Sequence, residues 1–570
     1  MLDLQKNFTV IYRLPYILLF CFYALFAEAA YSQNNGLTRG YPFIQNFTNK
    51  DFPAADNINW SATQDEIGNM YFANKYGVLK YDGNNWSLLN TRSEVLSICY
   101  DTLTHRIFVG CIEDFGYLDI DFAGKNKFVS LSNLLGKNEK IGMVWDCIAT
   151  SEGIYFLSEK KLVLFKNNAL SVWNSKNGFQ YIFHVGKHLF LSEIGIGLFL
   201  MQNDSLNFVK GSEIFKESRV VFIDLWMKNP NELIIATREK GLFNSTLLFD
   251  EKGKPELNSK SANKSTEQLF KSTSLYSGIK LSDNNYAYCT LTGGVIITDP
   301  MGNLVAKYTS QNGLGCDIIN DIFEDKSGHL WLSTENGISL IMWSLPIFSF
   351  NNFGNISGIV ESMEYLKGRL FVATSAGIYV LNGKTNQFEK FDFPTIQVWQ
   401  MLKIEDEEAL LAATSNGIYK IFPNGYQLLS SADLGAFNIS KSKKHKNLYH
   451  LGLFDGLASF TYDGGLFQLN PVSKSINYPI RDIREDKKGN IWLSSNYNGI
   501  ILIPASADNI TAAINSSYNY VNYTVENGLP NLNANFIHEI DGEIAAITYN
   551  GLYRLNISGD INKMSFNQLE

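Results

Sequence analysis

The stretch Asp325-Lys-Ser-Gly-His-Leu-Trp-Leu-Ser-Thr-Glu-Asn-Gly337-Ile338 decides the fold, because it recurs along the chain. It returns as Asp486-Lys-Lys-Gly-Asn-Ile-Trp-Leu-Ser-Ser495 and as Asp65-Glu-Ile-Gly-Asn-Met-Tyr-Phe-Ala73. The spacing of about forty residues is typical of repeat architectures, in which each copy is one supersecondary unit. Twelve units are marked by a closing glycine or, in one case, by a degenerate copy near Lys161: Gly77, Gly116, Gly195, Gly241, Gly294, Gly337, Gly377, Gly417, Gly456, Gly499 and Gly551.

Each unit has the pattern of short strands joined by tight turns. Leu330–Thr334 and Ile491–Ser495 are short apolar or β-branched runs, and Asn-Gly pairs such as Asn336-Gly337 supply the positive φ that a hairpin turn needs. No window of ten or more residues inside a unit keeps the apolar period of a helix. The sequence therefore predicts an all-β fold of tandem β-propellers, with about twelve four-stranded blades.

Twelve blades exceed the four to eight that one ring usually holds, so we expect two rings. With a break near Trp343–Pro346, residues 33–345 form a first propeller of about seven blades, and residues 346–570 form a second of about five, incomplete in this chain. A six-plus-six division remains open.

Two segments lie outside the simple repeat. Phe43–Phe47 resembles Tyr520–Tyr523, at the position of an outermost strand, so we expect it to complete a later blade of one ring. Glu251–Ser272 is rich in Lys, Ser and Asn, and we expect an inserted surface loop there.

The N-terminus has the features of a secretory signal. Lys6 and Arg13 precede the uncharged run Leu14–Ala27, which is too short to span a bilayer comfortably. We therefore expect residues 1–32 to be a signal peptide, cleaved near Ala30 to Gln33, and the protein to be periplasmic or secreted.

Composition argues against several classes of function. The net charge is −8, from 48 basic and 56 acidic residues without a basic stripe, so no nucleic-acid partner is expected. The five cysteines after the signal have no metal-binding spacing, so neither a metal nor a cofactor is expected. Buried free thiols are the expectation for them, with a Cys99–Cys111 disulfide as the alternative.

The search for chemistry favours binding over catalysis. Asp65, Asp325 and Asp486 occupy one recurring position before a glycine, where aspartate stabilises a turn, and no catalytic motif appears. The positions at which the blades differ are better candidates. Alignment of the innermost strands brings five side chains to one position, where they could bind a ligand at the channel mouth by stacking and hydrogen bonding, or else pack between blades: Trp60, Trp145, Asn320, Trp399 and Arg481.

The pattern Ile322-Phe-Glu-Asp325 to Gly337-Ile338, with the lead-in Asn312-Gly-Leu314, resembles the two-component regulator propeller repeat. Asn527-Gly-Leu-Pro-Asn531 repeats the lead-in. The resemblance implies the periplasmic sensor region of a Bacteroidetes-type hybrid two-component or triple-tyrosine regulator, which has two seven-bladed propellers and recognises oligosaccharides. It also implies a membrane-anchored output module as a partner, and a chain truncated before the triple-tyrosine and output domains.

The sequence hypothesis is therefore an extracytoplasmic ligand-binding sensor region for signal transduction, which recognises a soluble oligosaccharide and is not an enzyme. Two alternatives from other classes stay open: a secreted propeller enzyme acting on polysaccharide, as a lyase or glycosidase, and a secreted protein-interaction scaffold. An unfinished ring would expose a strand edge, which predicts aggregation or a homodimer through edge pairing.

Overall fold

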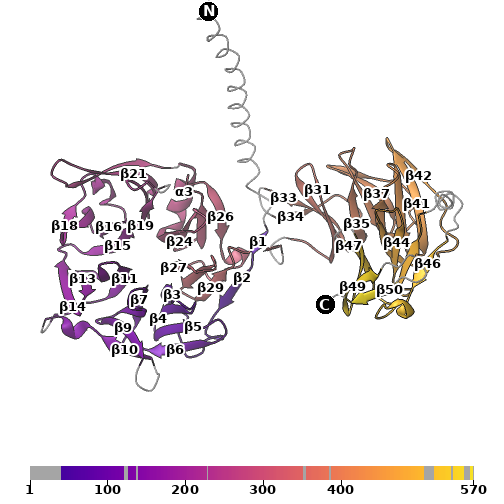
Figure 1. Ribbon diagram of the computed structural model, residues 1–570. Helices are drawn as coiled ribbons and strands as arrows, with labels where there is room; N and C mark the ends of the chain where they lie inside the picture. Colours follow the sequence, from indigo (N-terminus) through magenta and orange to yellow (C-terminus); the bar gives the residue numbers. More distant parts are fainter. Residues whose placement is uncertain are drawn as a thin grey trace, which may run out of the picture. The chain divides into compact units, whose positions relative to one another are not determined.

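The structure is a computed structural model that divides into two compact units, Gly40–Ser349 and the part from Phe350 onward (Figure 1). It describes residues 40–120, 126–136, 139–226, 229–262, 264–350, 355–383, 387–505, 519–540, 543–556 and 565–568. The predicted signal peptide lies outside these residues, as does most of the 505–517 stretch. No helix in the described ranges has both the length and the apolar character that a membrane crossing requires.

The predicted fold class is confirmed. The described residues form twelve four-stranded sheets, and in each sheet the neighbouring strands are antiparallel. One further pair, β1 (Tyr41–Pro42) and β30 (Phe348–Ser349), joins the two ends of the first unit. In eleven sheets the four strands follow one another in the chain, as expected for blades made of consecutive hairpins.

The first unit contains seven of these sheets, and their innermost strands are neighbours in a closed series that returns from β27 to β3 (Figure 1). The strands are β3 (Asn59–Gln64), β4 (Met70–Asn74), β5 (Gly77–Tyr81), β6 (Trp86–Asn90), β7 (Val95–Asp101), β8 (Arg106–Cys111), β9 (Phe115–Ile120), β10 (Asn126–Ser130), β11 (Val144–Thr150), β12 (Gly153–Ser158), β13 (Lys161–Lys166), β14 (Ala169–Asn174), β15 (Phe179–Val185), β16 (His188–Glu193), β17 (Gly197–Gln202), β18 (Ser205–Phe208), β19 (Val220–Leu225), β20 (Glu232–Thr237), β21 (Gly241–Phe249), β22 (Pro255–Ser261), β23 (Leu275–Lys280), β24 (Tyr286–Thr290), β25 (Val295–Thr298), β26 (Leu304–Tyr308), β27 (Ile319–Glu324), β28 (Leu330–Thr334), β29 (Gly337–Ile341) and β2 (Ile44–Phe47).

Strand β2 answers the question that the sequence left open for Phe43–Phe47. It pairs with β29 and so completes the seventh sheet with residues from the start of the unit. Phe47 is 5% exposed and stacks on Trp331, with 6.0 Å between ring centroids, and it also contacts Tyr81 and Trp86 of the first sheet. The closing strand thus joins the last sheet to the first through an aromatic cluster.

The repeated aspartate is a turn residue, as predicted. The Asp325 carboxylate accepts hydrogen bonds from the backbone N–H groups of Ser327 and His329, and from Trp331 Nε1 at 2.9 Å. The Asp486 carboxylate likewise accepts a hydrogen bond from Trp492 Nε1 at 3.0 Å, and the Asp65 carboxylate accepts one from the Tyr71 hydroxyl. This carboxylate therefore fixes both the turn and the large aromatic side chain of the next strand.

The prediction of a surface loop at Glu251–Ser272 is wrong. Most of this stretch forms the outermost strand β22 and the helix α3 (Lys264–Thr273). Its apolar residues are few, but Leu257 and Phe270 are 4% and 0% exposed, so sparse contacts suffice to order both elements. The polar composition hid this pattern. The remaining short helices of the described chain are 3-10 turns at Ser132–Leu134, Ser212–Phe215, Ser310–Asn312 and Val525–Asn527.

The second unit contains five sheets that pack one on the next in chain order. Met363 of its first innermost strand is 61% exposed, whereas Met401, at the same register position of the next, is 2% exposed. The strands are β31 (Val360–Leu366), β32 (Arg369–Thr374), β33 (Gly377–Asn382), β34 (Gln387–Lys390), β35 (Val398–Lys403), β36 (Leu410–Thr414), β37 (Gly417–Phe422), β38 (Gly425–Leu428), β39 (Ala436–Lys441), β40 (Leu448–Leu453), β41 (Gly456–Asp463), β42 (Leu466–Leu469), β43 (Ile480–Glu485), β44 (Ile491–Ser495), β45 (Ile500–Ile503), β46 (Val521–Tyr523), β47 (Phe536–Ile540), β48 (Glu543–Thr548), β49 (Gly551–Asn556) and β50 (Ser565–Gln568).

Side chains on the innermost strands join successive sheets. A β-bulge interrupts the register near the start of these strands. Each innermost strand is also the edge strand of its sheet, so alternate backbone N–H groups point away from the ladder. In the first unit Asp321 Oδ2 accepts from Ala62 N at 3.0 Å. In the second unit Gln400 Oε1 accepts from Ile439 N at 2.6 Å. In both cases a side chain of one sheet accepts a hydrogen bond from a backbone N–H of the neighbouring sheet, because a buried N–H needs a partner.

Two of these joining groups are buried carboxyls of the first unit. Burial raises the pKa of Asp146 to about 7 and the pKa of Asp321 to about 6, and the charge of Asp321 adds to the shift of Asp146. A hydrogen bond from the backbone of Ile182 to Asp146 opposes its shift. Both carboxyls therefore hold protons at a pH where an exposed aspartate has lost them.

The closing strand should contribute strongly to the stability of the first unit. We expect Phe47→Ala to destabilise it by roughly 3–5 kcal/mol, because the substitution empties a buried site between two sheets. Phe43, four residues earlier and 43% exposed, is the matched control, and Phe43→Ala should change stability by no more than about 0.5 kcal/mol. Urea unfolding of both variants checks this, and equal shifts would contradict the role of β2.

The buried carboxyl should make stability depend on pH. The folded-state pKa of Asp146 is raised, so between about pH 4 and pH 7 the folded chain holds a proton that the unfolded chain releases, and stability falls as pH rises. Asp146→Asn removes the charge and keeps an acceptor for Ile182. We expect this variant to be more stable than the unchanged chain at pH 8, with a flatter profile between pH 5 and 8.

The measurement is the urea midpoint at each pH. The exposed Asp204, changed to Asn, is the control and should leave the profile as it is. An Asp146→Asn profile parallel to that of the unchanged chain would show that this carboxyl does not titrate in that range.

Candidate functional site

The five predicted residues occupy one structural position. Each lies at the β-bulge of an innermost strand, so each is placed near the end of the axis at which these strands begin. They do not form one site, however, because Trp60, Trp145 and Asn320 belong to the first unit, whereas Trp399 and Arg481 belong to the second.

The three residues of the first unit take part in contacts between sheets. Trp60 packs against the core of the first two sheets, and its Nε1 donates to Glu94 Oε1 at 2.9 Å. Trp145 packs against the core between the third and fourth sheets. Asn320 is 5% exposed and donates to the backbone oxygen of Asn59 at 3.0 Å. Their role in ligand binding stays a prediction.

The two residues of the second unit lie together. The Arg481 guanidinium is 4.7 Å from the ring centroid of Trp399 and 4.1 Å from that of Phe437. The Trp399 and Phe437 rings meet edge to face at 5.0 Å, and Phe454 lies 4.2 Å from Phe437. We refer to Trp399, Phe437, Phe454 and Arg481 as the aromatic platform.

The sequence comparison of blades missed two members of the platform. Phe437 occupies the same bulge position on β39, so a full alignment of every innermost strand could have found it. Phe454 lies in the hairpin between β40 and β41, outside the aligned strand, and only the fold brings it to Phe437.

A carboxylate completes the polar side of the platform. Glu361 holds the bulge position of β31, and its Oε1 accepts from Gln397 Nε2 at 3.0 Å. Burial lowers the pKa of Arg481 below its usual value, and the charge of Glu361 opposes that shift. Trp399 Nε1 is buried without a hydrogen-bond partner among the described residues. The platform thus provides aromatic surfaces, a guanidinium and an indole N–H that makes no hydrogen bond in the described chain, and Glu361 adds a carboxylate beside it.

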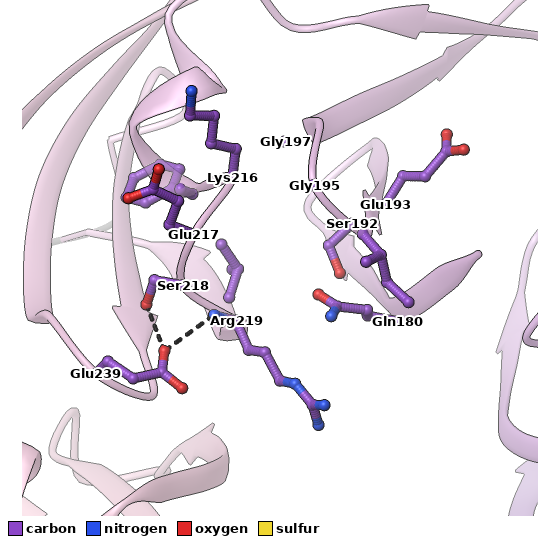
Figure 2. Close-up of a pocket in the computed structure, with 13 residues that line it drawn as sticks. Gln180, Ser192, Glu193, Gly195, Gly197, Lys216, Glu217, Ser218, Arg219 and Glu239 are labelled. Carbon is purple, nitrogen blue, oxygen red and sulfur yellow. Dashed lines mark hydrogen bonds between the residues drawn. The ribbon is translucent and has the colours of Figure 1, made fainter. Parts of the chain in front are cut away.

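A pocket of about 280 Å³ lies in the first unit, between the sheets β15–β18 and β19–β22. Figure 2 shows Lys216, Glu217, Ser218 and Arg219 on one side of it, facing Ser192 and Gln180. The loop is held by Glu239, which accepts from Ser218 Oγ at 2.7 Å and from the backbone N–H of Arg219 at 3.1 Å. Gln180 occupies the bulge position of β15, the position of the five predicted residues.

The cysteine thiols are a further set of reactive groups. The five cysteines in the described chain are free thiols, including the pair for which a disulfide was the alternative, and burial raises the pKa of Cys111 to about 12. A thiol with so high a pKa is a poor nucleophile. Within the described ranges, no three His, Cys, Asp or Glu side chains gather as metal ligands would.

The comparisons with known proteins agree with the repeat motif. The sequence profile of the two component regulator propeller matches residues 313–336, which include β27 and β28, and residues 474–497, which include β43 and β44. No curated protein is significantly similar to the chain.

Two solved structures are similar to the chain. The extracellular domain of a hybrid two-component system from B. thetaiotaomicron has a TM-score of 0.60 and 17% identity, over 90% of this chain and 77% of that one. At this identity the likeness is one of fold. The extracellular domain of a second B. thetaiotaomicron system has a TM-score of 0.41 and 13% identity, over 92% of this chain and 73% of that one.

The motif from Asp325 to Ile338 falls inside one matched segment except for its last two residues, and the similar run from Asp486 to Ser495 falls wholly inside the other. The predicted resemblance is thereby confirmed, and the chain carries the repeats of the two-component regulator propeller family.

Proposed function

We propose that this chain is an extracytoplasmic sensor region that binds an oligosaccharide without transforming it. The family repeats and the fold shared with extracellular domains of two-component systems support a sensor. The observation that carries the ligand class is the aromatic platform, in which the Arg481 guanidinium stacks on two rings.

The platform has the chemistry that a sugar requires. Aromatic faces cover the apolar C–H face of a pyranose, and Trp399 provides such a surface, whereas Phe437 packs against Arg481 and Phe454. Arg481 donates to hydroxyl or carboxylate oxygens through a planar fork, while Glu361 accepts from hydroxyls. The unmade hydrogen bond of Trp399 Nε1 favours an acceptor in the ligand, because a buried donor without a partner costs free energy.

The same groups argue for binding over hydrolysis. Glycosidases commonly use two carboxyl groups that face the scissile bond. At the platform Glu361 is engaged by Gln397, and the repeated aspartates of the blades are engaged in their turns. A secreted enzyme and a protein-interaction scaffold are therefore the alternatives that the experiment below must separate.

The sensor would act in the periplasm, or outside the cell, after cleavage near Ala30 to Gln33. Its partner for signalling would be a membrane-anchored output module. The ligand would change the arrangement or the flexibility of the sensor, and so bias the output by its differential affinity for two states. We propose a homodimer as the form in which such a change would be transmitted.

Replacement of Trp399 tests this function. We expect one class of oligosaccharide to bind to residues 33–570 in calorimetric titration, and Trp399→Ala to weaken its affinity about tenfold, a loss of about 1.4 kcal/mol of stacking. Trp399→Phe should keep most of the affinity. Trp173→Ala is the control, because this tryptophan lies on an outermost strand of the other unit.

Chromatography of the titrated sugar provides the second readout. Recovery of unchanged oligosaccharide supports a sensor, whereas shortened or unsaturated products would make the protein an enzyme. A chain that binds none of a broad glycan panel, but retains a protein from the periplasm, would be a scaffold.

A further inference from the structure

The pocket of the first unit contains charged side chains without partners. Arg219, Lys216 and Glu217 are exposed, and in the described residues no hydrogen bond or ion pair engages their side chains. The Gln180 amide is likewise unbonded. Gln180 comes from one sheet and the loop of Lys216 to Arg219 leads into the next, and both line the pocket; the Lys216 and Arg219 side chains extend in opposite directions (Figure 2).

The backbone of Arg219 is fixed although its side chain is free. Its N–H donates to Glu239 at 3.1 Å, and its carbonyl accepts from the N–H of Arg238 at 2.9 Å. A fixed backbone lowers the entropy cost of presenting the guanidinium to a ligand. Figure 2 shows this side chain extending from the loop past Gln180.

The neighbouring arginine, Arg238, is not part of the pocket lining. Its Nε donates to the backbone oxygen of Leu275 at 3.1 Å, and its guanidinium lies 5.5 Å from the ring centroid of Tyr276. Arg219 is therefore the arginine that the pocket presents to a ligand. A guanidinium fork matches the two oxygens of a carboxylate, so this side chain favours an anion.

Two of the three acidic side chains of the pocket accept hydrogen bonds from neighbouring turns and loops. Glu239 accepts from the loop, and Glu193 accepts from Ser175 Oγ at 2.6 Å and from the backbone of Asn177 at 3.3 Å. These two carboxylates are occupied in holding turns. The Glu217 carboxylate lies on the side of the loop away from Ser192 and Gln180 (Figure 2).

The size of the pocket limits the ligand. The volume of about 280 Å³ is that of a small ligand pocket, which suits one sugar ring with its substituents. Ser192 Oγ accepts from the backbone of Tyr181 at 3.1 Å, so its hydrogen remains available to a sugar oxygen.

We propose that this pocket binds a single uronic acid residue of a carbohydrate. The carboxylate is bound by Arg219, and the ring hydroxyls by Gln180 and Ser192. The proposal rests on the proposed function for the carbohydrate class, but its site lies in the other unit and depends on different residues.

The test is calorimetric titration of the full chain with D-glucuronate and D-galacturonate, and with glucose and galactose as their neutral counterparts. We expect one uronate to bind, its neutral counterpart to bind at least about tenfold more weakly, and added salt to weaken the uronate. Arg219→Gln should weaken the uronate at least about tenfold. Arg92→Gln, a change at an exposed arginine far from the pocket lining, should not.

Equal affinity for a uronate and its neutral sugar, or full affinity in Arg219→Gln, would overturn the proposal, as would the absence of uronate binding. Thermal melting of each variant confirms that it is folded. Trp399→Ala separates the two sites: uronate binding that survives this change supports the pocket. Uronate binding lost in Trp399→Ala but kept in Arg219→Gln would place the ligand on the platform and refute the pocket.

Discussion

The pairing of β2 with β29 is the contact on which the first unit depends. When sheets are stacked in series, the outer faces of the first and the last sheet have no neighbouring sheet. Closure of the ring packs these two faces against each other. Here the seventh sheet takes its last strand from residues that precede the first sheet, so the two ends of the unit are held by hydrogen bonds and by the packing of Phe47 against Trp331. The second unit shows the contrast, because Met363 is exposed where Met401 is buried.

A second constraint follows from the innermost strands. These are edge strands with backbone N–H groups that point away from their own sheets, and the side chains of Asp321 and Gln400 accept hydrogen bonds from such groups of the neighbouring sheet. The bulge in each strand turns one residue toward the end of the axis. The innermost strands therefore both join the sheets and carry the variable side chains at their bulges. Because successive bulges lie side by side, Trp399, Phe437 and Arg481 are in contact although they lie about forty residues apart in the chain.

The candidate site was predictable only where it follows the repeat. Trp399 and Arg481 were found because they occupy equivalent positions in consecutive units, and the turn aspartates were assigned for the same reason. Phe454 and Arg219 lie outside the aligned innermost strands, in the segments just before β41 and β19. Local patterns contain no information about such residues, since their positions depend on how one sheet is twisted against the next.

The sequence by itself determined the fold class, the four-stranded unit and the role of the aspartate before each glycine, because these depend on interactions between residues close in the chain. Only the tertiary structure decided which sheet Ile44–Phe47 completes, and that Lys264–Thr273 is a helix. It also decided which bulge residues share a unit and that Arg219 faces a pocket. These features depend on contacts between distant residues, and their free energy comes from burial and packing that no local pattern records.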